Sequence, residues 1–121
     1  MQDRSIVFVY GSLRKGEYNY EGFKQQFGDE IEYLETTTVK GFDLYRLWGY
    51  PGIKVGQGTL VVDVLRCGPE AKASMDRMEI GANYSVKPLQ VNNYVGEIYL
   101  YEGKVQEVNK IDHGDWKKRD K

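Results

Sequence analysis

The feature that most constrains this chain is a short apolar run, Ile6 to Val9, that ends in the glycine turn Tyr10-Gly11-Ser12-Leu13. A continuous, mostly β-branched run of this kind is typical of a strand buried on both faces. Glycine lets the backbone turn sharply after the strand, and successive N–H groups of such a turn can face a ligand. The pattern also fits a plain strand exit, since Gly-Ser turns are common in loops.

Two glycines, Gly11 and Gly16, have the spacing of a phosphate-binding P-loop. The next residues are Glu17 and Tyr18, where that motif needs a lysine and a serine or threonine. The sequence therefore excludes a P-loop, but the turn remains suited to binding negatively charged oxygen.

Composition narrows the class of protein. The 121 residues predict a single domain, 1–121, with a polar C-terminal tail over about 110–121 that we expect to be frayed. Lys and Arg number 17 against 18 Asp and Glu, so no basic surface indicates a nucleic-acid or membrane partner. The single Cys67 and the absence of a signal-like or membrane-spanning apolar segment favour a cytoplasmic protein.

Two segments have helical signals. The first has Asn19 as its expected N-cap, aromatic residues at helical spacing, and Gly28 as its stop. The second begins at Pro69, a favoured first helical position, and ends before Gly81. We expect both helices to cover a β-structure.

Most of the remaining chain has the character of strands. The 14 glycines and 10 tyrosines favour many short strands joined by tight turns. One hairpin is expected from Tyr84–Val91 and Val95–Tyr101, joined by Asn92-Asn93, because Asn tolerates positive φ. The sequence thus predicts a β-rich α+β fold.

One carboxylate stands out in the second helix. Glu79 follows Met75 by four residues and Met78 by one, so it lies at the edge of the apolar stripe. It also lies in the last turn, where the helix dipole disfavours an anion, and three residues after Asp76. All three circumstances would raise its pKa, which makes Glu79 the best general-base candidate. The alternative is a solvated Glu at the helix end.

Few residues of the chain support a metal site, a cysteine nucleophile or a nucleic-acid-binding surface. The lone His113 has no second histidine with which to build a metal site, and it lies in a loop-like stretch. Cys67 fits a small packed side chain better than a nucleophile, because no base is indicated beside it. An aromatic barrel that stacks nucleic-acid bases lacks the necessary basic stripe.

Three features occur together in this chain: the first strand closes with Phe8–Leu13, a helix ends with Met75–Glu79, and Tyr84 opens the next strand. In this combination the sequence resembles the gamma-glutamylcyclotransferase-like superfamily, in particular its gamma-glutamylamine cyclotransferase and AIG2-like branch. Tyr50-Pro51-Gly52 and the stretch from Ile111 to Trp116 also fit, so the similarity spans most of the chain.

The resemblance implies a small mixed β-barrel of about six to seven strands, flanked by short helices, with a cavity between the glycine turn and the helix that carries Glu79. Members of the family act on gamma-glutamyl amides. The α-amine of the substrate attacks its own γ-carbonyl, which releases the amine and forms 5-oxoproline. This transferase or lyase chemistry needs no cofactor and no metal, and the expected partner is the small substrate alone, bound by a monomer or weak homodimer.

The resemblance also implies roles for the site residues. Glu79 is the expected general acid and base, and the turn from Tyr10 to Leu13 supplies donors to an oxyanion or to the α-carboxylate of the substrate. Tyr84 and Tyr99 are expected to form the pocket wall. The chain has Ser85-Val86-Lys87 where many relatives have an arginine, which bears on the leaving amine. A protein that binds gamma-glutamyl compounds without catalysis is the alternative.

Overall fold

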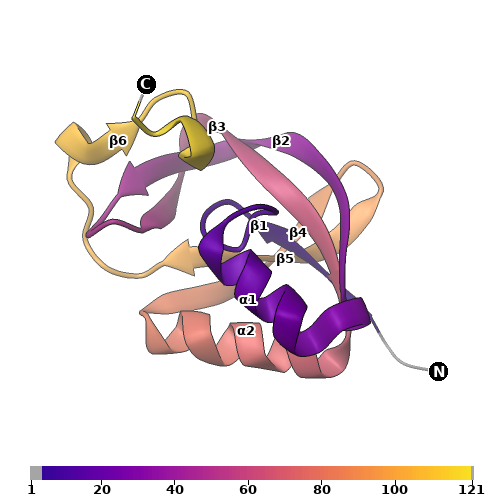
Figure 1. Ribbon diagram of the computed structural model, residues 1–121. Helices are drawn as coiled ribbons and strands as arrows, with labels where there is room; N and C mark the ends of the chain where they lie inside the picture. Colours follow the sequence, from indigo (N-terminus) through magenta and orange to yellow (C-terminus); the bar gives the residue numbers. More distant parts are fainter. Residues whose placement is uncertain (1–3, 121) are drawn as a thin grey trace.

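A computed structural model describes residues 4–120, and six strands form one mixed sheet with helices packed against it (Figure 1). The strands are β1 (Ser5–Val9), β2 (Ile31–Arg46), β3 (Pro51–Cys67), β4 (Tyr84–Val91), β5 (Tyr94–Tyr101) and β6 (Lys110–Ile111). The helices are α1 (Tyr18–Phe27), α2 (Pro69–Gly81) and the 3-10 turns η1 (Gly28–Glu30), η2 (Glu107–Asn109) and η3 (Trp116–Lys118). The strand order is β4-β5-β1-β3-β2-β6, and only the β1–β5 pair is parallel.

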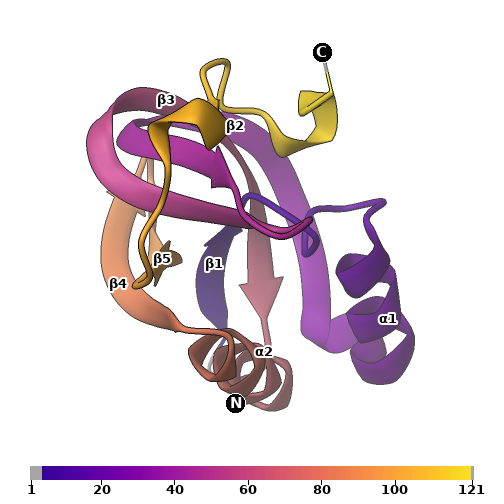
Figure 2. The same ribbon diagram turned by 90° about the vertical axis from the view of Figure 1, so that its left-hand side faces the viewer.

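The sheet curls strongly but does not close. Two register shifts, between Tyr33 and Glu35 and between Lys40 and Phe42, bend the long β2–β3 pair, whose curl is visible in Figure 2. A barrel requires its first and last strands to pair, yet β4 and the two-residue β6 are separate edges of this sheet. The α+β class is therefore confirmed, and the prediction of a β-barrel is wrong.

Both predicted helices and the predicted hairpin are present, but α2 includes Gly81 rather than ending before it, and the start of α1 also differs from the prediction. Helix α2 begins at Pro69 as expected, and the β4–β5 hairpin turns through Asn92, which has φ +54°. Helix α1 ends at Phe27, and its C-cap is the predicted stop Gly28, which also has φ +54°. Asn19 is not its N-cap, because the helix already begins at Tyr18. The side-chain amide of Asn19 instead donates a hydrogen bond to the hydroxyl of Ser12.

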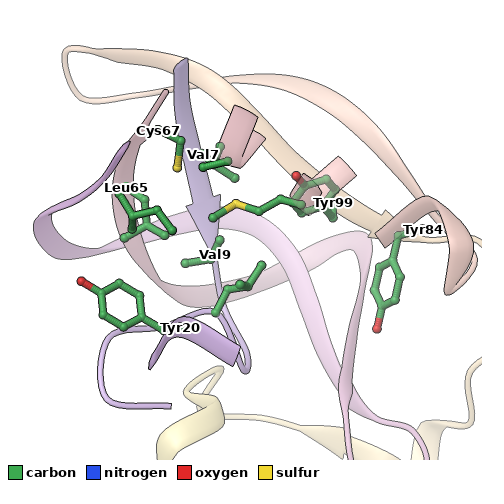
Figure 3. Close-up of a cluster of buried hydrophobic side chains, with 11 residues drawn as sticks. Val7, Val9, Tyr20, Leu65, Cys67, Tyr84 and Tyr99 are labelled. Atoms are coloured by element: carbon green, nitrogen blue, oxygen red, sulfur yellow. The ribbon is translucent and has the colours of Figure 1, made fainter. Parts of the chain in front are cut away.

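The first strand separates two hydrophobic clusters, as its continuous apolar run predicts. Val7 and Val9 belong to a cluster (Figure 3) that includes Tyr20 from α1 and Ala71 and Met75 from α2. Phe8 and Tyr10 face the other cluster, which includes Trp116 from the C-terminal segment. Alternate residues of β1 thus meet apolar partners on opposite faces, and this rigid strand leads directly into the glycine turn.

The prediction of a frayed C-terminal tail is wrong for residues 110–120, which form a segment packed against the rest of the protein. Lys121 lies outside the described residues. Strand β6 pairs with β2, and Trp116 is only 3% exposed. The N–H of Val61 donates to the carbonyl of Gly114 at 2.8 Å, which joins the segment to β3. Burial of the Trp116 indole holds the segment in place despite its charged end. Within the described part of the chain, no helix has the length and apolar character needed to cross a membrane.

Candidate active site

A cavity of about 150 Å³ lies between the end of β1, the start of α1 and the end of α2. All seven residues singled out from the sequence line it, and they are Tyr10, Gly11, Ser12, Leu13, Glu79, Tyr84 and Tyr99. Glu79 and the glycine turn are distant in sequence, yet they share this one space. Their roles in binding and catalysis stay predictions.

The glycine turn offers unused donors to the cavity. The N–H of Arg14 donates to the carbonyl of Gly11 at 2.9 Å and closes the turn. Among residues 4–120, the N–H groups of Gly11, Ser12 and Leu13 have no protein acceptor. A Cβ on Gly11 would overlap the ring of Pro51, so glycine permits the close approach of β3 to the turn. The turn can therefore bind negatively charged oxygen with neutral donors.

Glu79 is a half-buried carboxylate with no partner of opposite charge. Within the described residues, no hydrogen bond or ion pair reaches its side chain, and burial raises the pKa of its carboxyl from 4.5 to about 7. The direction of this shift is as predicted, but Asp76 is not a cause. The Asp76 carboxylate instead accepts hydrogen bonds from Lys72 at 2.8 Å and from the Tyr99 hydroxyl at 2.7 Å.

Three tyrosines, Tyr10, Tyr84 and Tyr99, form part of the cavity wall, and the hydroxyl of each donates a hydrogen bond within the protein. Tyr10 donates to the carbonyl of Tyr99 at 2.7 Å, and Tyr84 donates to the carbonyl of Pro51. Burial raises the pKa of all three phenols above the usual value of 10, so they stay protonated. They shape the pocket and offer oxygen lone pairs, and they are unsuited to donate a proton to the reaction.

A buried ion cluster of Arg14, Asp63 and Asp115 holds the end of the glycine turn in place. Arg14 is 4% exposed, and its guanidinium contacts Asp63 at 3.2 Å and Asp115 at 2.7 Å. The Lys15 N–H donates to the other oxygen of Asp63 at 2.8 Å. The cluster therefore ties the end of the turn to β3 and to the C-terminal segment. The positive charge nearest to the turn in sequence is thereby neutralised, and no Lys, Arg or His of the described part of the chain lines the cavity.

Other kinds of catalytic centre find no support in the described residues. No three His, Cys, Asp or Glu side chains of residues 4–120 gather as metal ligands. Cys67 is fully buried, and burial raises the pKa of its thiol to about 12, which suppresses the nucleophilic thiolate. His113 is exposed and accepts a hydrogen bond from the Asp115 N–H at 3.2 Å.

Sequence reasoning missed several side chains that line the cavity, namely Val9, Asn19, Tyr50, Pro51, Met78 and Ala82. Tyr50 and Pro51 had a visible signal, because they belong to a turn cluster that supports the family resemblance. For Asn19 the sequence predicts only an N-cap, which is the common use of Asn before a helix. No local pattern indicates that its amide faces the glycine turn.

Comparison with known proteins confirms the resemblance. The model of the family described as "Gamma-glutamyl cyclotransferase, AIG2-like" matches residues 7–118, so the chain belongs to this family. It is 31% identical over 116 residues to the gamma-glutamylcyclotransferase family protein YtfP of Escherichia coli K12. That alignment covers 95% of this chain and 98% of the relative.

Solved structures agree with this assignment. The solution structure of ytfP from Escherichia coli has a TM-score of 0.75 at 29% identity, covering 96% of this chain and 99% of that one. An AIG2-like protein from Mus musculus also has a TM-score of 0.75, at 18% identity, covering 93% of this chain and 87% of that one. At that identity, the mouse protein supports the fold alone.

Proposed function

We propose that this protein is a cyclotransferase that converts a gamma-glutamyl amine or amide to 5-oxoproline and a free amine. One observation carries the proposal: Glu79, whose pKa burial raises to about 7, shares a small cavity with a turn of unused backbone donors. A carboxyl group with a pKa near neutral can both accept and return a proton at physiological pH. Family membership supports the same reaction class.

The reaction needs a proton carrier but no protein nucleophile. Ionised Glu79 removes a proton from the α-ammonium group of the substrate, and the resulting amine attacks the γ-carbonyl carbon. The tetrahedral intermediate collapses as the bond to the leaving nitrogen breaks, and Glu79 returns the proton to that nitrogen. The α-nitrogen loses two protons in all, and the amine departs as an ammonium ion, so no co-reactant is consumed.

The glycine turn supplies the electrostatic part of the mechanism. Its N–H groups are fixed before the substrate arrives, because Arg14 closes the turn and the Asp63 cluster anchors it. Such donors stabilise a developing oxyanion, or hold the α-carboxylate, without reorganisation during the reaction. Tyr10, Tyr84 and Tyr99 limit the access of water to Glu79 and to the glycine turn.

The test is the release of 5-oxoproline from a panel of gamma-glutamyl amines and dipeptides. We expect turnover of at least one compound, and a loss of about 10²- to 10⁴-fold in kcat for Glu79→Gln. Glu70→Gln is the matched control, because Glu70 is an exposed carboxylate in the first turn of the same helix.

Two outcomes would change the conclusion. A folded Glu79→Gln variant as active as the parent would contradict the mechanism. Binding of gamma-glutamyl compounds to the unmodified protein without release of 5-oxoproline would instead identify a binding protein that uses the same cavity.

A further inference from the structure

Ser12, at the centre of the glycine turn, is fastened to helix α1 at two points. Its carbonyl accepts a hydrogen bond from the Tyr20 N–H at 3.0 Å. Its hydroxyl oxygen accepts a hydrogen bond from the side-chain amide of Asn19 at 2.7 Å. Asn19 and Ser12 both line the cavity, so the second hydrogen bond lies at the wall of the site.

The donor role of Asn19 determines what Ser12 can offer. A serine hydroxyl has one hydrogen and two lone pairs, and the Asn19 amide occupies a lone pair. Within residues 4–120, no protein group accepts the hydroxyl hydrogen. The hydrogen is therefore available to a ligand in the cavity, next to the N–H groups of Gly11, Ser12 and Leu13.

The charges of the cavity indicate which ligand group these donors receive. A gamma-glutamyl compound carries an α-carboxylate, yet among residues 4–120 no Lys, Arg or His lines the cavity to pair with it. A carboxylate without a cationic partner is stabilised by two or three neutral hydrogen bonds. Among the described residues that line the cavity, the turn N–H groups and the Ser12 hydroxyl are neutral donors of this kind that have no protein acceptor.

We propose that Asn19 is a positioning residue that aims the Ser12 hydroxyl at the α-carboxylate of the ligand. This assignment deepens the proposed function and takes the substrate class from it. It also distinguishes the two uses of the turn, because the donors on Ser12 hold the α-carboxylate and the reacting γ-carbonyl lies toward Glu79.

The probes are 5-oxoproline and its carboxamide, 5-oxoprolinamide, which differ in the charge of one group. Calorimetry on the whole chain should show that the unmodified protein prefers 5-oxoproline. Ser12→Ala should weaken 5-oxoproline binding about tenfold, as expected for a lost hydrogen bond to a charged group. Its affinity for the carboxamide should change much less, and Ser12→Thr should keep the preference because it keeps the hydroxyl.

The decisive variant is Asn19→Asp. A carboxylate at this position would accept the Ser12 hydrogen and repel the ligand, so 5-oxoproline binding should fall about 100-fold or more. An acidic residue in the first turn of α1 is favourable for the helix, so a purely structural role predicts an unchanged or higher melting temperature and unchanged binding. Gln25→Glu makes the same change of charge on an exposed part of α1 and should leave binding unchanged.

The outcomes separate this inference from the proposed function. Selective binding of 5-oxoproline that Asn19→Asp abolishes, without any turnover of gamma-glutamyl compounds, would support the carboxylate site and refute catalysis. Asn19→Asp with undiminished affinity, or an unmodified protein that binds both probes equally, would overturn the role of Asn19. A double variant Asn19→Ala/Ser12→Ala that binds much more weakly than Ser12→Ala would overturn the claim that Asn19 acts through Ser12.

Discussion

Two carboxylates of the protein, Asp63 and Glu79, have opposite surroundings. Asp63 is 1% exposed and receives the guanidinium of Arg14, the N–H of Lys15 at 2.8 Å and the hydroxyl of Thr36 at 2.8 Å. Glu79 is half-buried and, within residues 4–120, receives none of these. The partners of Asp63 stabilise its negative charge, whereas burial disfavours the negative charge of Glu79.

This difference separates stability from reactivity. The partners of Asp63 belong to β1's exit, to β2 and, through Arg14, to Asp115 in the C-terminal segment. That carboxylate connects distant parts of the fold and holds the glycine turn in place. Glu79 has no such partner within residues 4–120, and its raised pKa is the property that a proton carrier at neutral pH would need.

The largest effect on stability should come from Asp63→Ala. The substitution leaves Arg14 buried with Asp115 as its remaining partner, so we expect the free energy of unfolding to fall by about 3–5 kcal/mol. Urea unfolding measures the change. Asp112→Asn, at an exposed position, is the control and should change stability by less than about 0.5 kcal/mol. If both variants were equally stable, Asp63 would not hold the fold together.

Glu79→Gln should have the opposite effect, and the effect should depend on pH. The carboxyl keeps its proton up to about pH 7 in the folded state and loses it near 4.3 in the unfolded chain. Folding therefore becomes less favourable as the pH rises between these values, and the full penalty is present above pH 7. Glutamine removes it, so at pH 8 the variant should be more stable than the parent, by as much as about 3 kcal/mol.

The same variant provides its own control at low pH. Near pH 4 the carboxyl is protonated in the folded state and largely so in the unfolded chain, so parent and variant should have similar stability. A gain of equal size at pH 4 and pH 8 would mean that the substitution acts through packing rather than charge.

A smaller effect is expected at the turn itself. Gly11→Ala places a Cβ against the ring of Pro51 and should lower stability by about 1–3 kcal/mol. Displacement of the turn should also reduce 5-oxoproline binding. Gly22→Ala is the matched control, because nothing lies within 4 Å of a Cβ at Gly22, inside α1. Equal behaviour of the two variants would show that the turn tolerates a side chain.

The features best predicted from the sequence are those that depend on residues close together in the chain. The position of Glu79 at the edge of an apolar stripe follows from its spacing to Met75 and Met78, and the run before Tyr10 predicts a doubly buried strand. That the glycine turn and Glu79 share a cavity came from the family resemblance, because no spacing rule joins positions so far apart.

The remaining features depend on distant contacts. Arg14 lies 49 residues from Asp63 and 101 from Asp115, so nothing local distinguishes it from a solvated loop arginine. The same holds for the C-terminal segment, which is charged in sequence but anchored by Trp116. Barrel closure depends on whether β4 and β6 meet, and this is decided by the curl of β2 and β3 rather than by their sequence pattern.

The most direct test of the contrast between the two carboxylates is a carbon-13 NMR titration of the Glu79 side chain, assigned by its loss in Glu79→Gln. We expect a midpoint at about pH 7 for this carboxyl, with the acid limb of kcat/KM falling at the same pH. A midpoint near the ordinary value of 4.5 would contradict the claim that Glu79 is the proton carrier of the site.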